Sequence, residues 1–171
     1  MTLLVHEFVG AAFSGLGLNP VETFGLGLAS HYVLDAIPHW DYLKTSLIDE
    51  VETDANGKVI FKAFRKDERG VFRSILFDVF GGLVLSLLIF RPQSFYALIN
   101  LGAGLFGAFL PDFLGGLSFL APQNKFLKYH YQFHNFIHTK IRLDNHPYVG
   151  ATIQLAMLVL VVLIYRGAIK L

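Results

Sequence analysis

YVGATIQLAMLVLVVLIY, residues 148–165, has no charged side chain over its whole length. About 20 predominantly apolar residues are needed to cross the hydrocarbon core of a bilayer as a helix, so this stretch predicts a membrane-spanning helix. The composition agrees, because 54% of the 171 residues are hydrophobic and only 16% are charged, whereas a typical soluble domain has about 25% charged residues. The sequence therefore indicates an integral membrane protein.

Four more apolar segments precede this helix, and each is near the length that a transmembrane helix needs. Asn19-Pro20 and Arg91-Pro92 are turn signals between neighbouring segments, so the first four segments pair into two helical hairpins. We expect a single all-α domain over residues 1–171, an integral membrane helical bundle of about five transmembrane helices. The predicted spans are roughly 2–18, 21–37, 71–90, 94–117 and 147–165.

Two polar segments separate the hairpins and the last helix. Residues 42–70 form a basic insertion, in which Asn56-Gly57 between alternating residues predicts a small β-hairpin. Residues 124–140, NKFLKYHYQFHNFIHTK, combine aromatic and basic side chains in a pattern typical of an amphipathic helix at the membrane interface. Both segments would lie on the side that carries most Lys and Arg, which predicts that this side is cytoplasmic. We expect a protein of the cell (inner) membrane with its N-terminus inside and its C-terminus outside.

Charge and cysteine content exclude several classes of partner and site. The formal net charge is +1, which gives no reason to expect a nucleic acid partner. The chain contains no cysteine, so disulfides and thiolate metal ligands are excluded. Any metal ion would have to be held by His, Asp or Glu.

A weak internal repeat relates the second helices of the two predicted hairpins. GLGLASHYVLD (25–35) aligns with GAGLFGAFLPD (102–112), which pairs Asp35 with Asp112. Glycine-rich helices of this kind approach each other closely in a bilayer. Chance similarity between two helices rich in Gly, Leu and Phe is the alternative explanation.

Ionisable side chains inside spanning helices are energetically expensive and usually functional. The predicted topology brings them to one depth, near the cytoplasmic side, and the amphipathic helix adds further histidines there. His31 and Asp35 are four residues apart and therefore share one helix face. Imidazole and carboxylate groups without thiolates suit zinc, manganese or iron. The candidate ligands at this depth are His6, His31, Asp35, His39, Asp78, Asp112, His134 and His138.

Each of these residues also has a simpler interpretation when taken alone. His6 could be a satisfied polar residue, and His31 with Asp35 could form hydrogen bonds between helices. Asp41 could cap a helix or face solvent. The remaining polar residues are interpreted as an interfacial histidine (His130), a loop histidine (His146), a helix N-terminal charge (Glu22) and a residue that supports the site from beside His6 (Glu7).

Residues 30–41, SHYVLDAIPHWD, resemble the His-x3-Asp motif with a trailing His of the YdjM-like membrane-bound metal-dependent hydrolase family. Leu110-Pro111-Asp112 resembles its LPDxD motif, and His134–Thr139 resembles its HRGxTHS motif, with Asn135-Phe136 in place of Arg-Gly. His6 matches the N-terminal His of the family. A more distant likeness is to zinc-dependent phospholipase C and the related single-strand nucleases. Their N-terminal tryptophan ligand has no counterpart here, and His134-x3-His138 stands in place of His-x3-Glu.

The resemblance implies a metal-dependent hydrolase that acts on a phosphoester, such as a phospholipid headgroup, at the cytoplasmic membrane face. It implies one to three divalent ions, zinc first and manganese or iron as alternatives, which would activate water for attack on phosphorus. Asp35 or Asp41 would be the general base. A metal-binding or ion-handling membrane protein without hydrolytic chemistry is the alternative, and a structural protein whose buried His and Asp pair with each other is the third.

Overall fold

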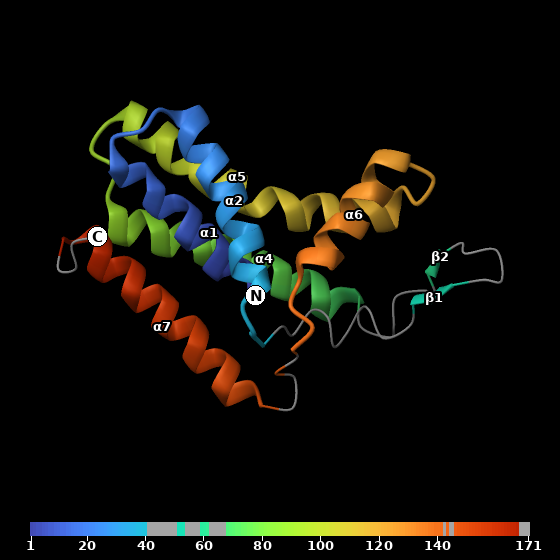
Figure 1. Ribbon diagram of the computed structural model, residues 1–171. Helices are drawn as coiled ribbons and strands as arrows, with labels where there is room; N and C mark the ends of the chain where they lie inside the picture. Colours follow the sequence, from blue (N-terminus) through green and yellow to red (C-terminus); the bar gives the residue numbers. More distant parts are fainter. Residues whose placement is uncertain (41–50, 54–58, 62–67, 142, 144–145, 168–171) are drawn as a thin grey trace.

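The computed structural model describes residues 1–40, 51–53, 59–61, 68–141, 143 and 146–167. Helices make up most of this part of the chain, together with one short antiparallel hairpin (Figure 1). The elements in chain order are α1 (Leu3–Ala12), the 3-10 helix η1 (Phe13–Leu16), α2 (Pro20–Ala36), β1 (Val51–Thr53), β2 (Val59–Phe61), α4 (Glu68–Phe90), α5 (Phe95–Leu120), α6 (Lys125–Ile137) and α7 (Pro147–Tyr165).

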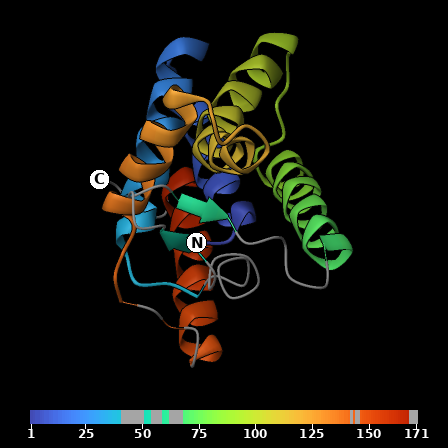
Figure 2. The ribbon, with the colours of Figure 1, turned by 90° about the vertical axis from the view of Figure 1, so that its right-hand side faces the viewer.

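Helix α1 lies at the centre of the bundle, with α2, α4, α5 and α7 arranged around it (Figure 2). One buried cluster on α1 joins Val5 and Val9 to Leu34 of α2, and a second joins Phe8 and Ala11 to α4 and α5. Helix α7 packs against both clusters through Leu158 and Val161. The short first helix is therefore the element on which the longer helices assemble.

Glycines allow α1, α2 and α5 to approach at backbone distance, as small residues do in membrane bundles. A Cβ atom at Gly27 would overlap the carbonyl oxygen of Gly104, and one at Gly104 would overlap that of Gly10. Gly27 and Gly104 are equivalent positions in the internal repeat, so its two copies cross where their sequences match. The repeat also aligns Gly25 with Gly102, and a Cβ atom added at either position would meet no described atom within 4 Å.

The turns at the far end of the bundle form as the sequence predicts. Asn19 accepts hydrogen bonds from the backbone of Val21 and Glu22, and the Glu22 side chain accepts one from the Asn19 N–H, which completes a capping box. Glu22 thus serves the N-terminus of α2. Ser94 caps α5 through the N–H of Ala97. Local polar contacts cap both helices, and the first turn is also held to α5 by the Asn100 amide, which donates to the Leu18 carbonyl at 2.9 Å.

Within the described residues, three helices are long and apolar enough to cross a membrane: Arg73–Phe90, Phe95–Ser118 and Pro147–Tyr165. The first predicted span is shorter in the structure, and the second keeps its 17 residues but lies one residue earlier, at Pro20–Ala36. The α1–η1 segment ends at Leu16 because Gly17 follows with a left-handed φ of 73°, and α2 ends at Ala36 because Ile37 is extended. Length and composition therefore support three of the five predicted spans.

The polar segments contain the secondary structure that the sequence predicts. Val51–Thr53 pairs antiparallel with Val59–Phe61, with Thr53 opposite Val59, which confirms the hairpin; Asn56 and Gly57 themselves lie outside the described residues. Residues Lys125–Ile137 form α6, a helix that buries Leu127 and His134 and exposes Phe126, Tyr129 and Phe136. The amphipathic helix is confirmed as a helix, and its two faces are distinct.

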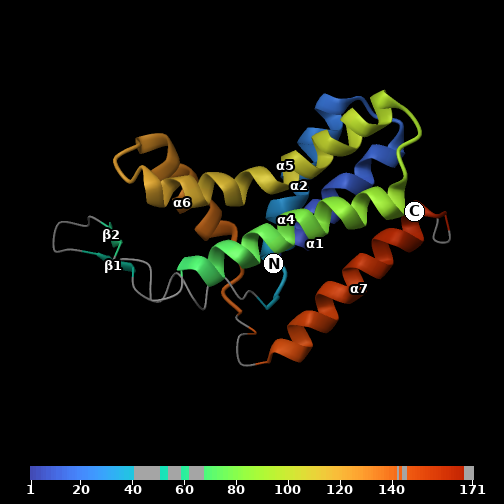
Figure 3. The same cartoon turned by 180° about the vertical axis from the view of Figure 1, so that it is seen from behind.

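Helix α5 changes direction along its length (Figures 1 and 3). Pro111 lies inside it and has no N–H to donate to the carbonyl of Gly107, which is a common cause of a bend. Asp112 follows this proline directly. The second half of α5 carries α6 back toward α2, and the site described below forms where these helices meet.

Candidate metal centre

Asp35 is the focus of a buried group of polar side chains. Its side chain is 2% exposed and lies in the last turn of α2. Oδ2 is 2.6 Å from Nε2 of His134 and 3.2 Å from Nε2 of His31, while Oδ1 is 3.1 Å from Nε2 of His6. Three helices, α1, α2 and α6, thus direct an imidazole toward one carboxylate.

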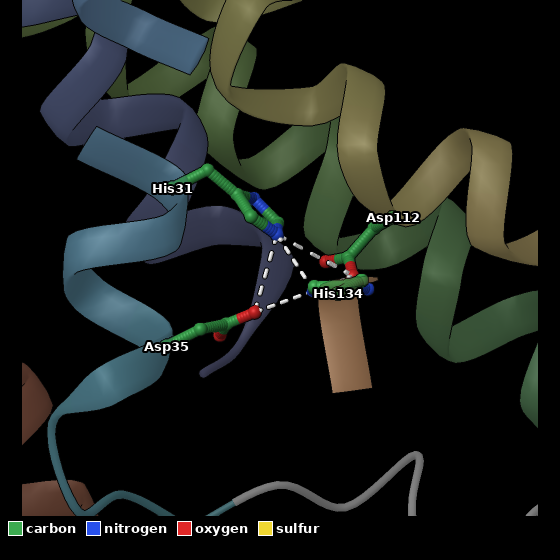
Figure 4. Close-up of side chains that lie close together, drawn as sticks. All are labelled: His31, Asp35, Asp112 and His134. Carbon is green, nitrogen blue, oxygen red and sulfur yellow. Dashed lines mark hydrogen bonds and ion pairs between the residues drawn. The ribbon is translucent and has the colours of Figure 1, made fainter. Parts of the chain in front are cut away.

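The first ligand group consists of His31, Asp35, Asp112 and His134. Their candidate ligand atoms all lie within 4.8 Å of one another, and Figure 4 shows the four side chains converging from α2, α5 and α6. Nε2 of His31 and Nε2 of His134 are 3.1 Å apart, and each is 3.8 Å from Oδ1 of Asp112. Two imidazoles and two carboxylates can supply the four ligands of a structural metal site, or three ligands of a catalytic site with the fourth position left for water.

The second ligand group consists of Asp35, His39 and His138, all buried, and their ligand atoms also lie within 4.8 Å of one another. Nε2 of His138 is 3.7 Å from Oδ1 of Asp35. The Met1 amino nitrogen lies 3.2 Å from the same Oδ1 and contacts Nε2 of His39. Asp35 therefore presents Oδ2 to the first group and Oδ1 to the second.

Two of the histidines are oriented by backbone carbonyls, as metal-ligating histidines usually are. Nδ1 of His31 donates to the carbonyl of Ala108 at 2.7 Å, and Nδ1 of His39 donates to the carbonyl of Ile37 at 2.7 Å. A carbonyl can only accept, so the proton of each neutral ring is on Nδ1. The lone pair of each Nε2 is then directed into its ligand group.

His6 lies at the back of the first ligand group. It is 0% exposed and stacks on His31 with a ring-centroid separation of 4.1 Å. Nε2 faces Asp35, and neither ring nitrogen makes a hydrogen bond of good geometry within the described residues. His6 is not a member of either ligand group, and its imidazole contacts the Asp35 carboxylate that both groups share.

Aromatic and polar contacts surround the groups. Tyr32 packs edge-on against His31 and His134, and its hydroxyl lies 3.3 Å from Nε2 of His130. Burial lowers the pKa of His130, and its position near His134 and His31 lowers it further. The N–H of Thr139 donates to the backbone carbonyl of Asp35 at 2.8 Å, which ties the chain after α6 to the end of α2.

The structure brings together seven of the predicted site residues: His6, His31, Asp35, His39, Asp112, His134 and His138. Asp78 lies outside both groups, and its Oδ2 accepts a hydrogen bond from the N–H of Leu3 at 3.0 Å. Asp41, the second predicted general base, falls outside the described residues. Both oxygens of Asp35 face imidazoles.

Sequence patterns did not identify Gln154, which hydrogen-bonds Thr2 and Trp40 at the edge of the second group. A polar residue in the middle of an otherwise apolar helix was the available signal. Glu7 is also buried beyond expectation: its side chain lies against Gly82 of α4, and neither oxygen has a hydrogen-bond partner in the described part of the chain.

The donor atoms fit a divalent metal ion. Nitrogen and carboxylate oxygen donors suit zinc, manganese and iron, and the oriented tautomers of His31 and His39 leave the nitrogen that a metal would need. The buried His and Asp side chains could therefore hold a metal ion. No protein-family model, curated protein or solved structure matches the chain.

Proposed function

We propose that this protein is a membrane-bound metal-dependent hydrolase that acts on a phosphoester. The observation that carries the proposal is the pair of ligand groups that share Asp35, because its two oxygens face separate sets of imidazoles. The motifs that resemble those of YdjM-like hydrolases contribute residues to both groups. Zinc is the expected ion, and between one and three ions would be held.

Charge and burial support a cation in the first ligand group. Asp35 is 1% exposed. Asp112 lies within 4 Å of the imidazoles of His31 and His134, which also face Asp35. A buried carboxylate is costly unless it is paired with a positive charge or bound to a metal. With His31 neutral, two ionised carboxylates would be balanced by one divalent ion.

The residues divide their tasks according to exposure. His31, His134 and Asp35 are buried and would bind and orient the ion, whereas the Asp112 side chain is 32% exposed and faces the open side of the group. Substrate would approach from that side. Divalent ions in such a site make water a better nucleophile and stabilise negative charge on phosphorus. Asp35 would serve as a ligand through both of its oxygens.

The proposed setting is the inner membrane, with all five apolar helices in the bilayer and the ligand groups at its cytoplasmic face. The basic polar segments would lie on that side, and the lysines of α6 with its exposed Phe126, Tyr129 and Phe136 favour an interfacial position. A phospholipid headgroup is the phosphoester that such a site would meet. Membrane lipids would then surround the protein and also supply its substrate.

The first experiment measures metal content by plasma mass spectrometry on detergent-purified protein. Wild type is compared with the His31→Ala/Asp35→Ala double variant and with His146→Ala, which removes an exposed histidine at the start of α7. We expect stoichiometric metal in wild type and in His146→Ala and none in the folded double variant. Phosphodiesters and phospholipids are then screened for hydrolysis. Wild type that stays free of metal after reconstitution with zinc, manganese and iron would refute the proposal.

A second candidate is a metal-binding or ion-handling membrane protein without hydrolytic chemistry. It is favoured by buried polar side chains that continue away from the ligand groups: Glu7 on α1, then Ser86 near the end of α4 and Thr23 near the start of α2, each 0% exposed. Metal uptake into proteoliposomes distinguishes the two. Uptake that Glu7→Gln abolishes, without phosphoester hydrolysis, would favour the second candidate.

A further inference from the structure

Gln154 is an unusual residue in its helix. α7 has no charged residue, and most of its side chains are half-buried or exposed, yet Gln154 is 5% exposed. A polar side chain in an apolar helix is costly in a membrane unless its groups find partners. Its position and its burial therefore require an explanation.

The amide of Gln154 joins two segments that are far apart in the sequence. Oε1 accepts from the N–H of Thr2 at 3.0 Å and from the Thr2 hydroxyl at 2.8 Å. Nε2 donates to the carbonyl of Trp40 at 3.0 Å. Because the Thr2 N–H can only donate and the Trp40 carbonyl can only accept, the orientation of the amide is determined. One side chain thus holds both segments.

Both segments belong to the surroundings of the second ligand group. Trp40 directly follows His39, and Thr2 follows Met1, whose amino nitrogen contacts His39 and Asp35. One turn before Gln154, Gly150 lies against the backbone and Cβ of Trp40, where any Cβ on residue 150 would overlap them. Helix α7 therefore accommodates Trp40 at a glycine and fixes its carbonyl with an amide.

We propose that Gln154 is a positioning residue for the second ligand group: by holding Trp40 and Thr2, it keeps His39 directed at Asp35. This inference rests on the proposed metal site. His39 lies three residues beyond the end of α2, so the helix alone does not orient it. The Ile37 carbonyl orients the His39 ring through Nδ1, and α7 holds the backbone next to His39 through Trp40.

Attachment of α7 to the bundle does not depend on Gln154. At the other end of the helix, the Tyr165 ring packs on Phe90, and its hydroxyl donates to the Phe90 carbonyl at 3.3 Å. Leu158 and Val161 pack on both buried clusters between the two ends. Loss of the Gln154 amide should therefore release residues 39 and 40 locally while the bundle stays assembled.

The test titrates metal-free full-length protein with Co²⁺ and follows the visible absorption of the bound ion together with its stoichiometry. Wild type is compared with Gln154→Leu, His39→Ala and the combination of both. Thr152→Val is the matched control, because Thr152 is exposed and its hydroxyl donates only within α7, to the Tyr148 carbonyl. Thermal unfolding of each variant checks that the bundle is intact.

We expect two Co²⁺ ions in wild type and in Thr152→Val. Gln154→Leu should bind the first ion as wild type does and the second about 10–100-fold more weakly, the usual effect of losing a supporting contact. In the combined variant, Gln154→Leu should add nothing to the loss caused by His39→Ala. If Gln154→Leu fails to fold, Gly150→Ala, which displaces Trp40, should weaken the second ion in its place.

Other outcomes separate this inference from the proposed function. Gln154→Leu that binds both ions like wild type, or that weakens both equally, would overturn the positioning role and leave the metal site intact. A single ion in wild type that His39→Ala does not affect would do the same. Wild type that binds no ion would overturn both proposals.

Discussion

The two ligand groups that share Asp35 are held in place by different parts of the fold. In the first group, His31, Asp112 and His134 all lie within helices. In the second, His39 lies beyond the end of α2 and His138 is the C-terminal cap residue of α6. Packing between helices positions the first group, whereas a few hydrogen bonds of chain segments position the second.

This difference predicts different sensitivity to substitution. The first group depends on the glycine crossing of α2 and α5, where a change affects the whole bundle. The second depends on the Thr139–Asp35 backbone bond and on the Gln154 amide, where a change acts locally. Ligands on rigid elements are held more precisely than ligands on connecting segments. We therefore expect the first group to bind its ion more tightly.

The largest effect should come from Asp35, the residue that the groups share. Asp35→Asn should reduce bound metal to less than about a tenth of wild type, because charge and one oxygen are lost from both groups at once. Asp78→Asn is the matched control, since Asp78 is a buried aspartate outside both groups. Metal content by mass spectrometry measures the outcome. Equal losses in the two variants would contradict the assignment of Asp78 outside the site.

His39→Ala should remove one of two ions and spare the other. The first group keeps all of its ligands, so its affinity should change by less than about threefold, the size of change that separates independent sites from coupled ones. Titration with Zn²⁺ in a calorimeter would resolve the two steps, with His146→Ala as the histidine control. Loss of both steps would show that the groups act as one site.

Gly104→Ala tests the packing that holds the first group. The new methyl would overlap the Gly10 carbonyl, and overpacking of this kind costs about 1–3 kcal/mol. Gly102→Ala, which meets no described atom, should leave stability unchanged or slightly raised, because alanine favours the helix. Thermal unfolding of the metal-free proteins in detergent compares them. A similar midpoint for both variants would exclude the crossing as a stability determinant.

The smallest effect should come from the far end of α2. Asn19→Ala removes the capping box and should cost about 1 kcal/mol of stability while both ions stay bound. Unfolding midpoint and metal content are measured on the same sample. Loss of metal from this variant would mean that metal binding follows global stability, and the contrast between the two groups would then not hold.

Much of the fold could be predicted from the sequence because its signals are local. The apolar runs and the prolines after Asn19 and Arg91 determine where helices begin and end, so the predicted segments nearly coincide with α2, α4, α5 and α7. The sequence predicts the first segment over 2–18, and it is found as α1 and η1 over 3–16, but the change from α-helix to 3-10 helix after Ala12 has no signal in the sequence. The depth of a residue in the bundle follows from its position along its helix, so the sequence predicts His31, Asp35 and Asp112 at the same depth.

The neighbouring helix that each side chain faces could not be predicted in the same way. Asp78 has the right depth for the site, yet it faces the start of α1 and accepts from Leu3. Spacing along one helix does not reveal which neighbour a face meets. The roles of Ala108 and Gln154 depend on contacts between segments 77 and 114 residues apart, and no single-sequence pattern encodes such contacts.

The positions of the ligands along the chain have a consequence for biogenesis. They run from His6 on α1 to His138, just after α6. An ion can meet a full ligand set only after α1, α2, α5 and α6 have been inserted and packed. Metal loading would thus be a late step in assembly, and an ion bound at Asp35 would lock the finished arrangement of helices, since it binds no earlier intermediate equally well.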